Sequence, residues 1–232
     1  TTMPANANGS FFPVGVPTLV TYKATDAGGL MTTCSFTVTI IDTEAPQITC
    51  PANIVVSNTT GLCSAVVNYT APVGTDNCPG SVTVLQSGLA SGSSFPVGVS
   101  TIVYKVTDVP GAMATCSFTV TVNDTELPVI SCPSNISVPN DANLCSAVVT
   151  YTAPVGTDNC PAPNTVQTAG LASGATFPVG VTTNTFKVTD ASGNTATCSF
   201  TVTVTDAQAP QITCPAPIVK SNDPGLCSAL VT

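Results

Sequence analysis

A six-residue stretch, Cys-Ser-Phe-Thr-Val-Thr, occurs three times in the chain, beginning at Cys34, Cys116 and Cys198. The copies begin 82 residues apart, and a constant spacing of this length indicates a tandem array of one folded unit. In the second copy, Phe118 and Val120 alternate with Ser and Thr, which is the period of a half-buried β-strand. The chain must therefore fold as a series of similar units that each contain β-strands.

The period divides the 232 residues into two complete units and two partial ones. We expect the complete units at 43–124 and 125–206. Residues 1–42 match the back half of a unit, and residues 207–232 match its front. The chain is thus predicted to hold nearly three small domains rather than one large domain.

The composition favours β-structure throughout. Thr, Val and Ser are abundant, 17 Gly and 20 Pro are scattered, and no long stretch follows a helical pattern. Each complete unit reads as about six or seven short strands with frequent turns, which is typical of a Greek-key β-sandwich of the immunoglobulin type. Because the chain has no Trp, we expect the fibronectin-III-like variety. We interpret Phe95-Pro96-Val97-Gly98 as a turn.

Charge and residue types exclude several functions. Only 7% of the residues are charged, the net charge is −8, and four Lys are the only cations, so nucleic acid is not an expected partner. No apolar run approaches the roughly 18 to 20 residues of a membrane-spanning helix. The chain has no His and no Arg for acid–base or phosphate chemistry, so we do not expect an enzyme.

Eleven cysteines argue for an oxidising compartment, either extracellular or at a cell surface. Zinc is the competing interpretation of clustered Cys. It has little support, because the chain has no Cys-x2-Cys pair and no His. We therefore expect disulfides.

Several motifs recur in a fixed order within the repeats. They are Asp-Thr-Glu-x-Pro-x-Ile-x-Cys-Pro, Cys-Ser-Ala-x-Val-x-Tyr, Asp-Asn-Cys, Phe-Pro-Val-Gly, Lys-Val-Thr-Asp and Cys-Ser-Phe-Thr-Val-Thr-Val. Over its whole length the chain resembles the hyalin repeat (HYR domain). The resemblance implies an immunoglobulin-like fold and a role in extracellular adhesion or matrix building.

The resemblance also implies a disulfide pattern. Family members with only two cysteines keep the pair in the first and last strands, which lie side by side in this fold. This pairing predicts Cys50–Cys116 and Cys132–Cys198, and we then expect Cys63–Cys78 and Cys145–Cys160. Sequence alone leaves the connectivity open.

Cys34, Cys214 and Cys227 lie in the partial units and have no partner in this scheme. We expect the chain to be a window of a longer filament, whose partners are further HYR repeats. Alternatively, identical subunits complete each other head to tail by donating strands. The two partial units together lack the 14 residues equivalent to 69–82, and with them the equivalent of Cys78. Strand donation therefore leaves Cys227 unpaired, and we favour the continuous array.

Carboxylates recur in one set at the junctions between units. The set comprises Asp42, Glu44, Asp76, Asp108, Asp124, Glu126, Asp158 and Asp190. In an immunoglobulin topology these linkers and loops meet at one pole. Such a set suits Ca²⁺, which takes six to eight oxygen ligands. The alternative is turn chemistry alone, because Asp favours turns and Gln208 replaces Glu at the third junction.

Five Asn-x-Ser/Thr sequences make glycans a further expected partner. They are Asn8, Asn58, Asn68, Asn123 and Asn135, and they do not occupy equivalent positions, so chance in a Thr-rich chain is the competing explanation.

Two functional classes remain after these exclusions. The first is a rigid extracellular fibre or stalk in which the repeats are spacers. The second is an adhesive module that recognises a cell-surface or carbohydrate partner. The repeats stay alike even in their loops, whereas recognition modules usually diverge there. We therefore favour the structural class.

Overall fold

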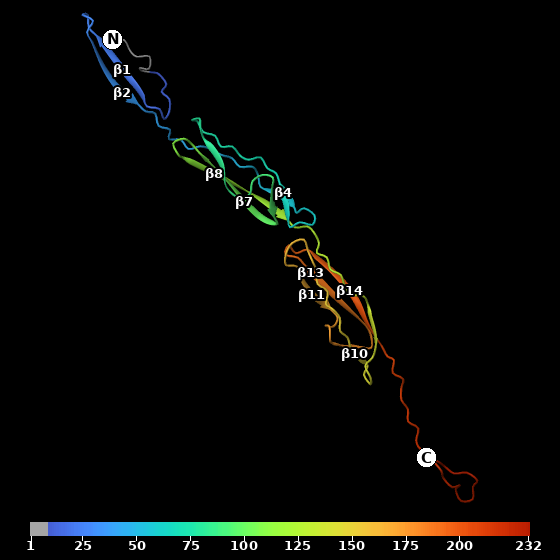
Figure 1. The fold of residues 1–232 in the computed structure, drawn as a ribbon. Helices are drawn as coiled ribbons and strands as arrows, with labels where there is room; N and C mark the ends of the chain where they lie inside the picture. The colour runs from blue at the N-terminus through green and yellow to red at the C-terminus, as the bar shows by residue number, and fades with distance from the viewer. Residues whose placement is uncertain (1–8) are drawn as a thin grey trace. The chain divides into compact units, whose positions relative to one another are not determined.

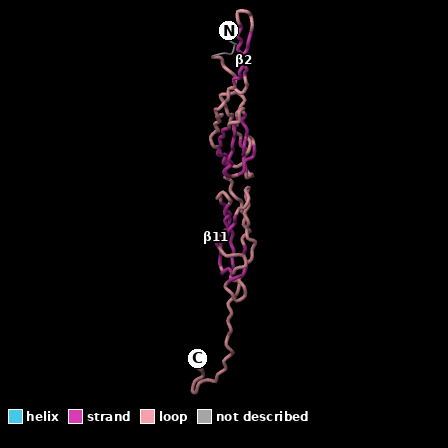
Figure 2. Tube along the Cα trace, turned by 90° about the vertical axis from the view of Figure 1, so that its left-hand side faces the viewer, coloured by secondary structure: helices cyan, strands magenta, loops and turns pink. Residues whose placement is uncertain are grey.

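The structure, a computed structural model, describes residues 9–232. All regular elements in that range are β-strands, and Figure 2 shows them connected by loops. The all-β class predicted from the sequence is confirmed. In the described range, no helix offers the length and hydropathy of a membrane span. The predicted sequon Asn8 lies outside the described residues.

The chain divides into two compact units. The first runs to Val129 and includes Gly156–Asn164 and Val188–Ala196. The second comprises Ile130–Val155, Thr165–Lys187 and Thr197–Thr232. The first unit therefore contains the region of strands β1 and β2 (Thr18–Thr25 and Met31–Val38), the first complete repeat and two segments of the repeat that follows.

The first complete repeat is a two-layered sandwich with the sheet orders β3-β8-β7-β5 and β4-β6. Its strands are β3 (Ile54–Ser57), β4 (Ser64–Val67), β5 (Val82–Ser87), β6 (Ser93–Pro96), β7 (Gly98–Thr107) and β8 (Met113–Asn123). The long strands β7 and β8 pair antiparallel, as Figure 1 shows. Strand β3 runs parallel to β8, so the first and last strands of the repeat are neighbours.

The second complete repeat has the same topology, with the sheet orders β11-β13-β14-β9 and β10-β12. Its strands are β9 (Ile136–Pro139), β10 (Ser146–Val148), β11 (Asn164–Ala169), β12 (Thr176–Pro178), β13 (Gly180–Thr189) and β14 (Thr195–Thr205). The partial repeat before them contributes the hairpin of β1 (Thr18–Thr25) and β2 (Met31–Val38). No strand follows Thr205.

Alternation along the strands builds the core of each sandwich. In the first repeat, Ile102 from β7 and Phe118 and Val120 from β8 are buried against Phe95. The turn predicted over Phe95-Pro96-Val97-Gly98 is wrong in its first half, because Phe95 and Pro96 lie in β6 and pair with β4; only Val97 separates β6 from β7. Pro96 is tolerated as the last residue of an edge strand, where its missing N–H removes no needed hydrogen bond.

A partly buried tyrosine ties one loop of each complete repeat to the core. The Tyr69 ring lies edge-on to Phe118 with centroids 5.0 Å apart, and its hydroxyl donates to the Leu89 carbonyl at 2.7 Å. Tyr151 donates to the Leu171 carbonyl at the same distance. The Gly-Leu-Ala-Ser-Gly loop thus makes the same contact in both complete repeats.

In an alkaline titration, Tyr69 should ionise at a higher pH than an exposed tyrosine. Desolvation by burial, with a smaller effect of the neighbouring Tyr104 hydroxyl, raises its pKa from 10.0 to about 12. The fold favours the protonated form, so the stabilisation is complete below the unfolded pKa and is lost as the pH rises through the folded one. Phenolate absorbance after rapid mixing should show a step near 12 that is missing in Tyr69→Phe. A Tyr69-dependent step near 10 would contradict this environment.

A second prediction concerns Gly74, which lies where the loop after β4 crosses the sheet. A Cβ at this position would meet Val106 Cβ at 2.6 Å, so Gly74→Ala should destabilise the repeat by about 1 to 3 kcal/mol through overpacking. Urea unfolding measures the change. Gly28→Ala is the matched control, since its Cβ would meet only the Asp26 side chain at 3.4 Å. Equal stability of the two variants would refute the close packing.

Candidate functional site

The loop after β4 forms the pole of the first repeat where the linker from the preceding repeat enters. Thr75 pairs with Gln47 of the linker through two backbone hydrogen bonds of 2.8 Å. Gly74 N donates to Thr83 Oγ1 at 2.8 Å. In the second repeat, Thr157 and Val129 make the same pair. Each linker is therefore clamped to this loop by the backbone.

Two aspartates face each other across the first clamp. Asp42 Oδ1 accepts from Glu44 N at 3.2 Å, and Asp76 Oδ2 accepts from Cys78 N at 3.0 Å. The other oxygen of each carboxylate is buried and has no hydrogen-bond partner. Ligand atoms of Asp42, Asp76 and Cys78 lie within 4.8 Å of one another. One oxygen of each carboxylate therefore lies close enough to the other to share a cation, and each carboxylate has one buried oxygen without a partner.

Asp108, in the loop between β7 and β8, adds a third such oxygen at the same pole. Its side chain is only 7% exposed. Oδ1 accepts from Gly111 N at 2.7 Å and from Ala112 N at 2.6 Å, whereas the buried Oδ2 has no partner. Each of these aspartates thus has one oxygen fixed by the backbone and one left unsatisfied.

The carboxylates at the second junction are arranged in the same way, and they too belong to the first compact unit. Asp124 is 7% exposed and accepts from Glu126 N at 3.1 Å, while Asp158 accepts from Cys160 N at 2.9 Å. The remaining oxygens of both carboxylates are buried without a partner, as is Asn159 Oδ1. Ligand atoms of Asp124, Asp158 and Cys160 again lie within 4.8 Å of one another.

The other predicted carboxylates have different surroundings. Glu126 Oε2 accepts from Gly61 N at 2.7 Å, and Gln208 Oε1 accepts from Asn143 N at 2.7 Å. The Glu-to-Gln change at the third junction therefore preserves a backbone hydrogen bond. Glu44 is exposed.

Asp190 uses both oxygens, because Oδ1 accepts from two backbone N–H groups and Oδ2 accepts from Asn194 Nδ2 at 2.8 Å. Burial raises the pKa of Asp190, but the hydrogen bonds from Asn194, Ser192 and Gly193 outweigh it and hold the pKa below its usual value. Asn194 Nδ2 also donates to the Asp124 carbonyl at 3.2 Å. The sequence analysis missed Asn194; its only signal was that Ala112 occupies the equivalent position in the other repeat.

A disulfide crosses the second junction and corrects two predicted pairs. Cys63 is bonded to Cys160, with Cα atoms 4.8 Å apart and a sequence separation of 97. The expected bridges Cys63–Cys78 and Cys145–Cys160 are absent, and Cys78 and Cys145 are not bonded. The Cys50–Cys116 and Cys132–Cys198 bridges are those that the resemblance implied.

The physical reason for the correction is the direction of β4. Cys63 immediately precedes this strand, and Cys78 follows in the loop at its other end, so the two cysteines lie at opposite poles of one repeat. The turn before Cys63 instead meets the next repeat, where Asn159 Nδ2 donates to the Leu62 carbonyl at 3.2 Å. Asn58 Oδ1 accepts from Thr125 N at 3.1 Å and holds the following linker against the same turn.

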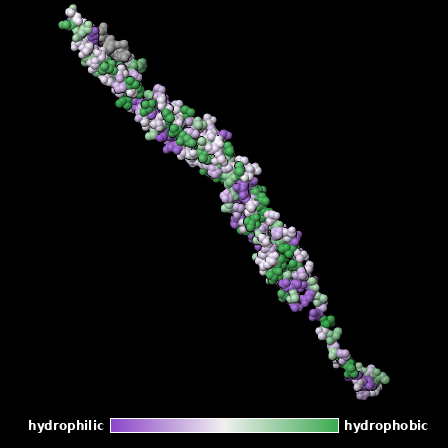
Figure 3. All heavy atoms as spheres, in the orientation of Figure 1, coloured by the Kyte–Doolittle hydropathy of each residue, from purple (hydrophilic) through white to green (hydrophobic). Residues whose placement is uncertain are grey.

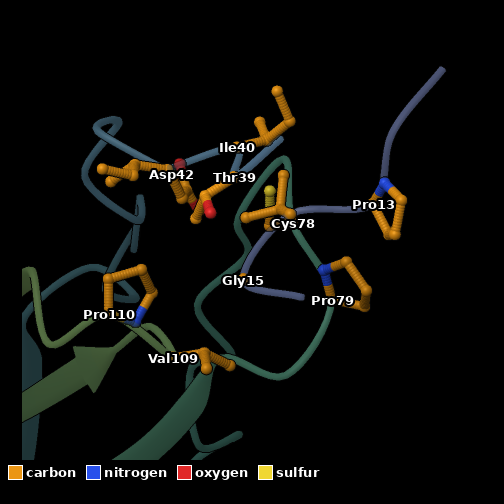
Figure 4. Close-up of a pocket in the computed structure, with 11 residues that line it drawn as sticks. Pro13, Gly15, Thr39, Ile40, Asp42, Cys78, Pro79, Val109 and Pro110 are labelled. Atoms are coloured by element: carbon orange, nitrogen blue, oxygen red, sulfur yellow. The ribbon is translucent and has the colours of Figure 1, made fainter. Parts of the chain in front are cut away.

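A pocket of about 550 Å³ lies beside Cys78 at the first junction. Its wall includes Pro13, Val14, Ile40 and Val109, and Figure 4 shows Asp42 and Cys78 on the same side of it. Interaction with the Asp42 carboxylate raises the pKa of the Cys78 thiol, and desolvation raises it further. The Cys78 thiol and the Asp42 carboxylate do not have the geometry of a full hydrogen bond, so Asp42 Oδ2 has no hydrogen-bond partner.

The four described sequons differ in their availability. The Asn58 amide is engaged, because Nδ2 donates to the Leu62 carbonyl at 3.1 Å. Asn68 and Asn123 are exposed. Asn135 is also exposed, although its Oδ1 accepts from Thr201 N at 2.9 Å.

Comparison with known proteins identifies three copies of one family. The family model described as "HYR domain" matches residues 2–40, 41–122 and 123–204. "Hyalin" of Strongylocentrotus purpuratus is 38% identical over 229 residues, covering 95% of this chain and 19% of that protein. "Hyalin" of Lytechinus variegatus is 34% identical over 232 residues, covering 94% of this chain and 42% of that protein. The chain thus spans less than half of the length of either relative.

Among solved structures, the extracellular domain of Protocadherin GammaB4 matches with a TM-score of 0.35 and 15% sequence identity. The match covers 82% of this chain and 38% of the other.

Peptide mapping without reduction should reveal the bridge across the junction. Cleavage before each Asp separates the cysteines of the complete repeats, except that peptide 42–75 keeps both Cys50 and Cys63. We expect 42–75 to be linked to 108–123 and to 158–189, because Cys63 bonds to Cys160. Peptide 76–107, with Cys78, should be released unlinked. Linkage of 42–75 to 76–107 would instead restore the bridge within one repeat.

Proposed function

The chain belongs to the HYR domain family, and on that premise we propose that it is a structural spacer whose inter-repeat junctions bind Ca²⁺. The chain is an extracellular module of the adhesion-related class. The spacer function and the calcium are the parts that we add.

The observation that carries the proposal is the set of buried carboxylate oxygens without partners. Asp42, Asp76 and Asp108 each present one at the first junction, and Asp124 and Asp158 do so at the second. A buried unpaired charge is costly, and neighbouring carboxylates repel one another. A divalent cation removes both costs at once.

The donor atoms suit Ca²⁺ better than a softer metal. Carboxylate and amide oxygens are hard ligands, and Asn159 Oδ1 supplies a further unsatisfied oxygen at the second junction. Cys160 is held in a disulfide and offers no thiolate, which disfavours zinc there. Backbone carbonyls and water complete a coordination number of six to eight.

Calcium at these positions would join the linker to the repeat that it enters. Asp42 and Asp124 belong to linkers, whereas Asp76 and Asp158 belong to the loops after β4 and β10. A cation shared by both adds a third constraint to the backbone clamp at Thr75 and the equivalent clamp at Thr157. The linker would then resist bending, as a spacer requires.

The recurring loop favours a structural function over ligand recognition. Residues 72–78 and 154–160 have the same sequence, Pro-Val-Gly-Thr-Asp-Asn-Cys. Gly74 packs on Val106, Thr75 pairs with the linker, and Asp76 faces Asp42. The residues of this loop thus serve the junction, which supports a spacer rather than an adhesive surface.

Calcium titration of the intact chain tests the proposal. We expect two sites by isothermal titration calorimetry, one in Asp76→Asn, one in Asp158→Asn and none in the double variant. Calcium at 100 times its dissociation constant should stabilise the folded state by about 2.7 kcal/mol for each occupied site if it binds only the folded state.

Asp26→Asn is the matched control for Asp108→Asn. Asp26 makes the same turn, with Oδ1 accepting from Gly28 N and Leu30 N, but it is exposed. The control should keep both sites, whereas Asp108→Asn should weaken the first. Absence of calcium binding at millimolar concentration, or binding that survives the double variant, would refute the proposal.

A further inference from the structure

The loop between the last two strands has the same backbone geometry in both complete repeats. Asp108 N donates to the Ala112 carbonyl at 3.1 Å, and Asp190 N donates to the Asn194 carbonyl at 3.0 Å. In return, Ala112 N and Asn194 N donate to Oδ1 of the aspartate in their own loop, at 2.6 and 2.7 Å. Both aspartates are 7% exposed. The two loops therefore hold their aspartates in the same way.

The side chain of the last residue of this turn differs between the two loops. Asn194 Nδ2 donates to Asp190 Oδ2 at 2.8 Å and to the Asp124 carbonyl at 3.2 Å. Its amide thus lies between a carboxylate of the loop and a carbonyl of the linker. Ala112 has no side-chain donor, and the buried Asp108 Oδ2 has no hydrogen-bond partner.

The Asn194 amide makes the contacts that a bound cation would make. A side-chain amide nitrogen carries two hydrogens, so it satisfies two oxygens at once. Ca²⁺ also binds carboxylate and backbone carbonyl oxygens, at about 2.3 to 2.6 Å. The amide therefore compensates Asp190 without a cation, and it ties the loop of the second repeat to its linker.

The loop of Asp108 also lies beside the linker at the first junction. Val109 follows Asp108, and it lines one pocket together with Asp42 of the linker (Figure 4). Because the two loops share their backbone hydrogen bonds, an Asn in place of Ala112 would present its amide as Asn194 does.

The two junctions consequently offer different numbers of unsatisfied carboxylates. At the first junction, Asp42, Asp76 and Asp108 each have one buried oxygen without a partner. At the second junction, Asp124 and Asp158 do, and the third carboxylate is occupied by the Asn194 amide.

One carboxylate matters in this chain because few other charges surround it. Only 7% of the residues are charged, and strongly hydrophilic surface forms only small patches on the face shown in Figure 3. The affinity of a site for Ca²⁺ depends on the number of its charged ligands. A difference of one available carboxylate should therefore separate the dissociation constants of the two sites by on the order of tenfold.

We propose that Asn194 sets the calcium affinity of the second junction by taking the place of a cation at Asp190, so that the second junction binds Ca²⁺ more weakly than the first. The inference rests on the proposed function, because it concerns the same two sites. With Ala112 at the equivalent position, the first junction leaves the Asp108 carboxylate to the cation. The second junction keeps, through Asn194, a link between loop and linker that does not depend on calcium.

Two full-length variants allow each site to be measured alone. Asp158→Asn leaves the first site, and Asp76→Asn leaves the second. Isothermal titration calorimetry with calcium chloride should give a dissociation constant about tenfold lower for the first site than for the second. Ala112→Asn added to Asp158→Asn should raise the constant of the first site about tenfold, and Asn194→Ala added to Asp76→Asn should lower that of the second by a similar factor.

The opposite directions of the two shifts separate this effect from loss of structure, which weakens binding in either variant. Leu30→Asn is the matched control, because Leu30 ends the same turn after Asp26, whose carboxylate is exposed. It should leave both constants unchanged. Circular dichroism and the three disulfides verify folding, and if Asn194→Ala does not fold, the shift in Ala112→Asn decides.

The outcomes distinguish this inference from the function on which it rests. Calcium binding in both single-site variants with equal constants, with no shift in Ala112→Asn, or with shifts in the same direction, would overturn the inference alone. No calcium binding in either single-site variant would overturn the proposed function and the inference together.

Discussion

The bond from Cys63 to Cys160 is the constraint on which the rest of the junction depends. It holds the turn before β4 against the loop that carries Asp158 and Asn159, and it closes a loop of 97 residues. In the chain-entropy model, closing a loop of this length stabilises the folded state by roughly 4 to 5 kcal/mol. The first complete repeat is therefore covalently joined to a loop of the repeat that follows it.

The electrostatic arrangement follows from the same contact. A chain with only 7% charged residues buries the carboxylates of Asp108 and Asp124 at the poles where repeats meet. Backbone N–H groups fix one oxygen of each carboxylate, and the other is buried without a hydrogen-bond partner. Buried oxygens without partners are tolerated in a native protein where a ligand satisfies them. The covalent bridge and the cation site would then both restrain the same linker.

Local patterns in the sequence were enough to predict much of the fold. Alternation predicted β8 and β14, and the parallel neighbour β3 followed from the sandwich topology. Phe95 was misread because Pro96 usually marks a turn, although an edge strand accepts it as a final residue.

The contacts at the junction were less predictable, because the residues that make them are about one repeat apart in the sequence. The partner of Cys63 depends on which pole each end of β4 reaches, and spacing along the chain does not encode this. Glu126 accepts a hydrogen bond from Gly61 N, 65 residues away, and no sequence pattern indicated this contact. Asp76 and Asp42 could be brought together from the sequence, since a linker and a loop of an immunoglobulin topology share a pole.

A crystal structure of the chain grown with Ca²⁺, with anomalous scattering recorded, tests the central claim most directly. The junction described above predicts one anomalous peak beside Asp42, Asp76 and Asp108, a second beside Asp124 and Asp158, and continuous density from Cys63 to Cys160. Peaks only on exposed carboxylates, or density joining Cys63 to Cys78, would contradict it.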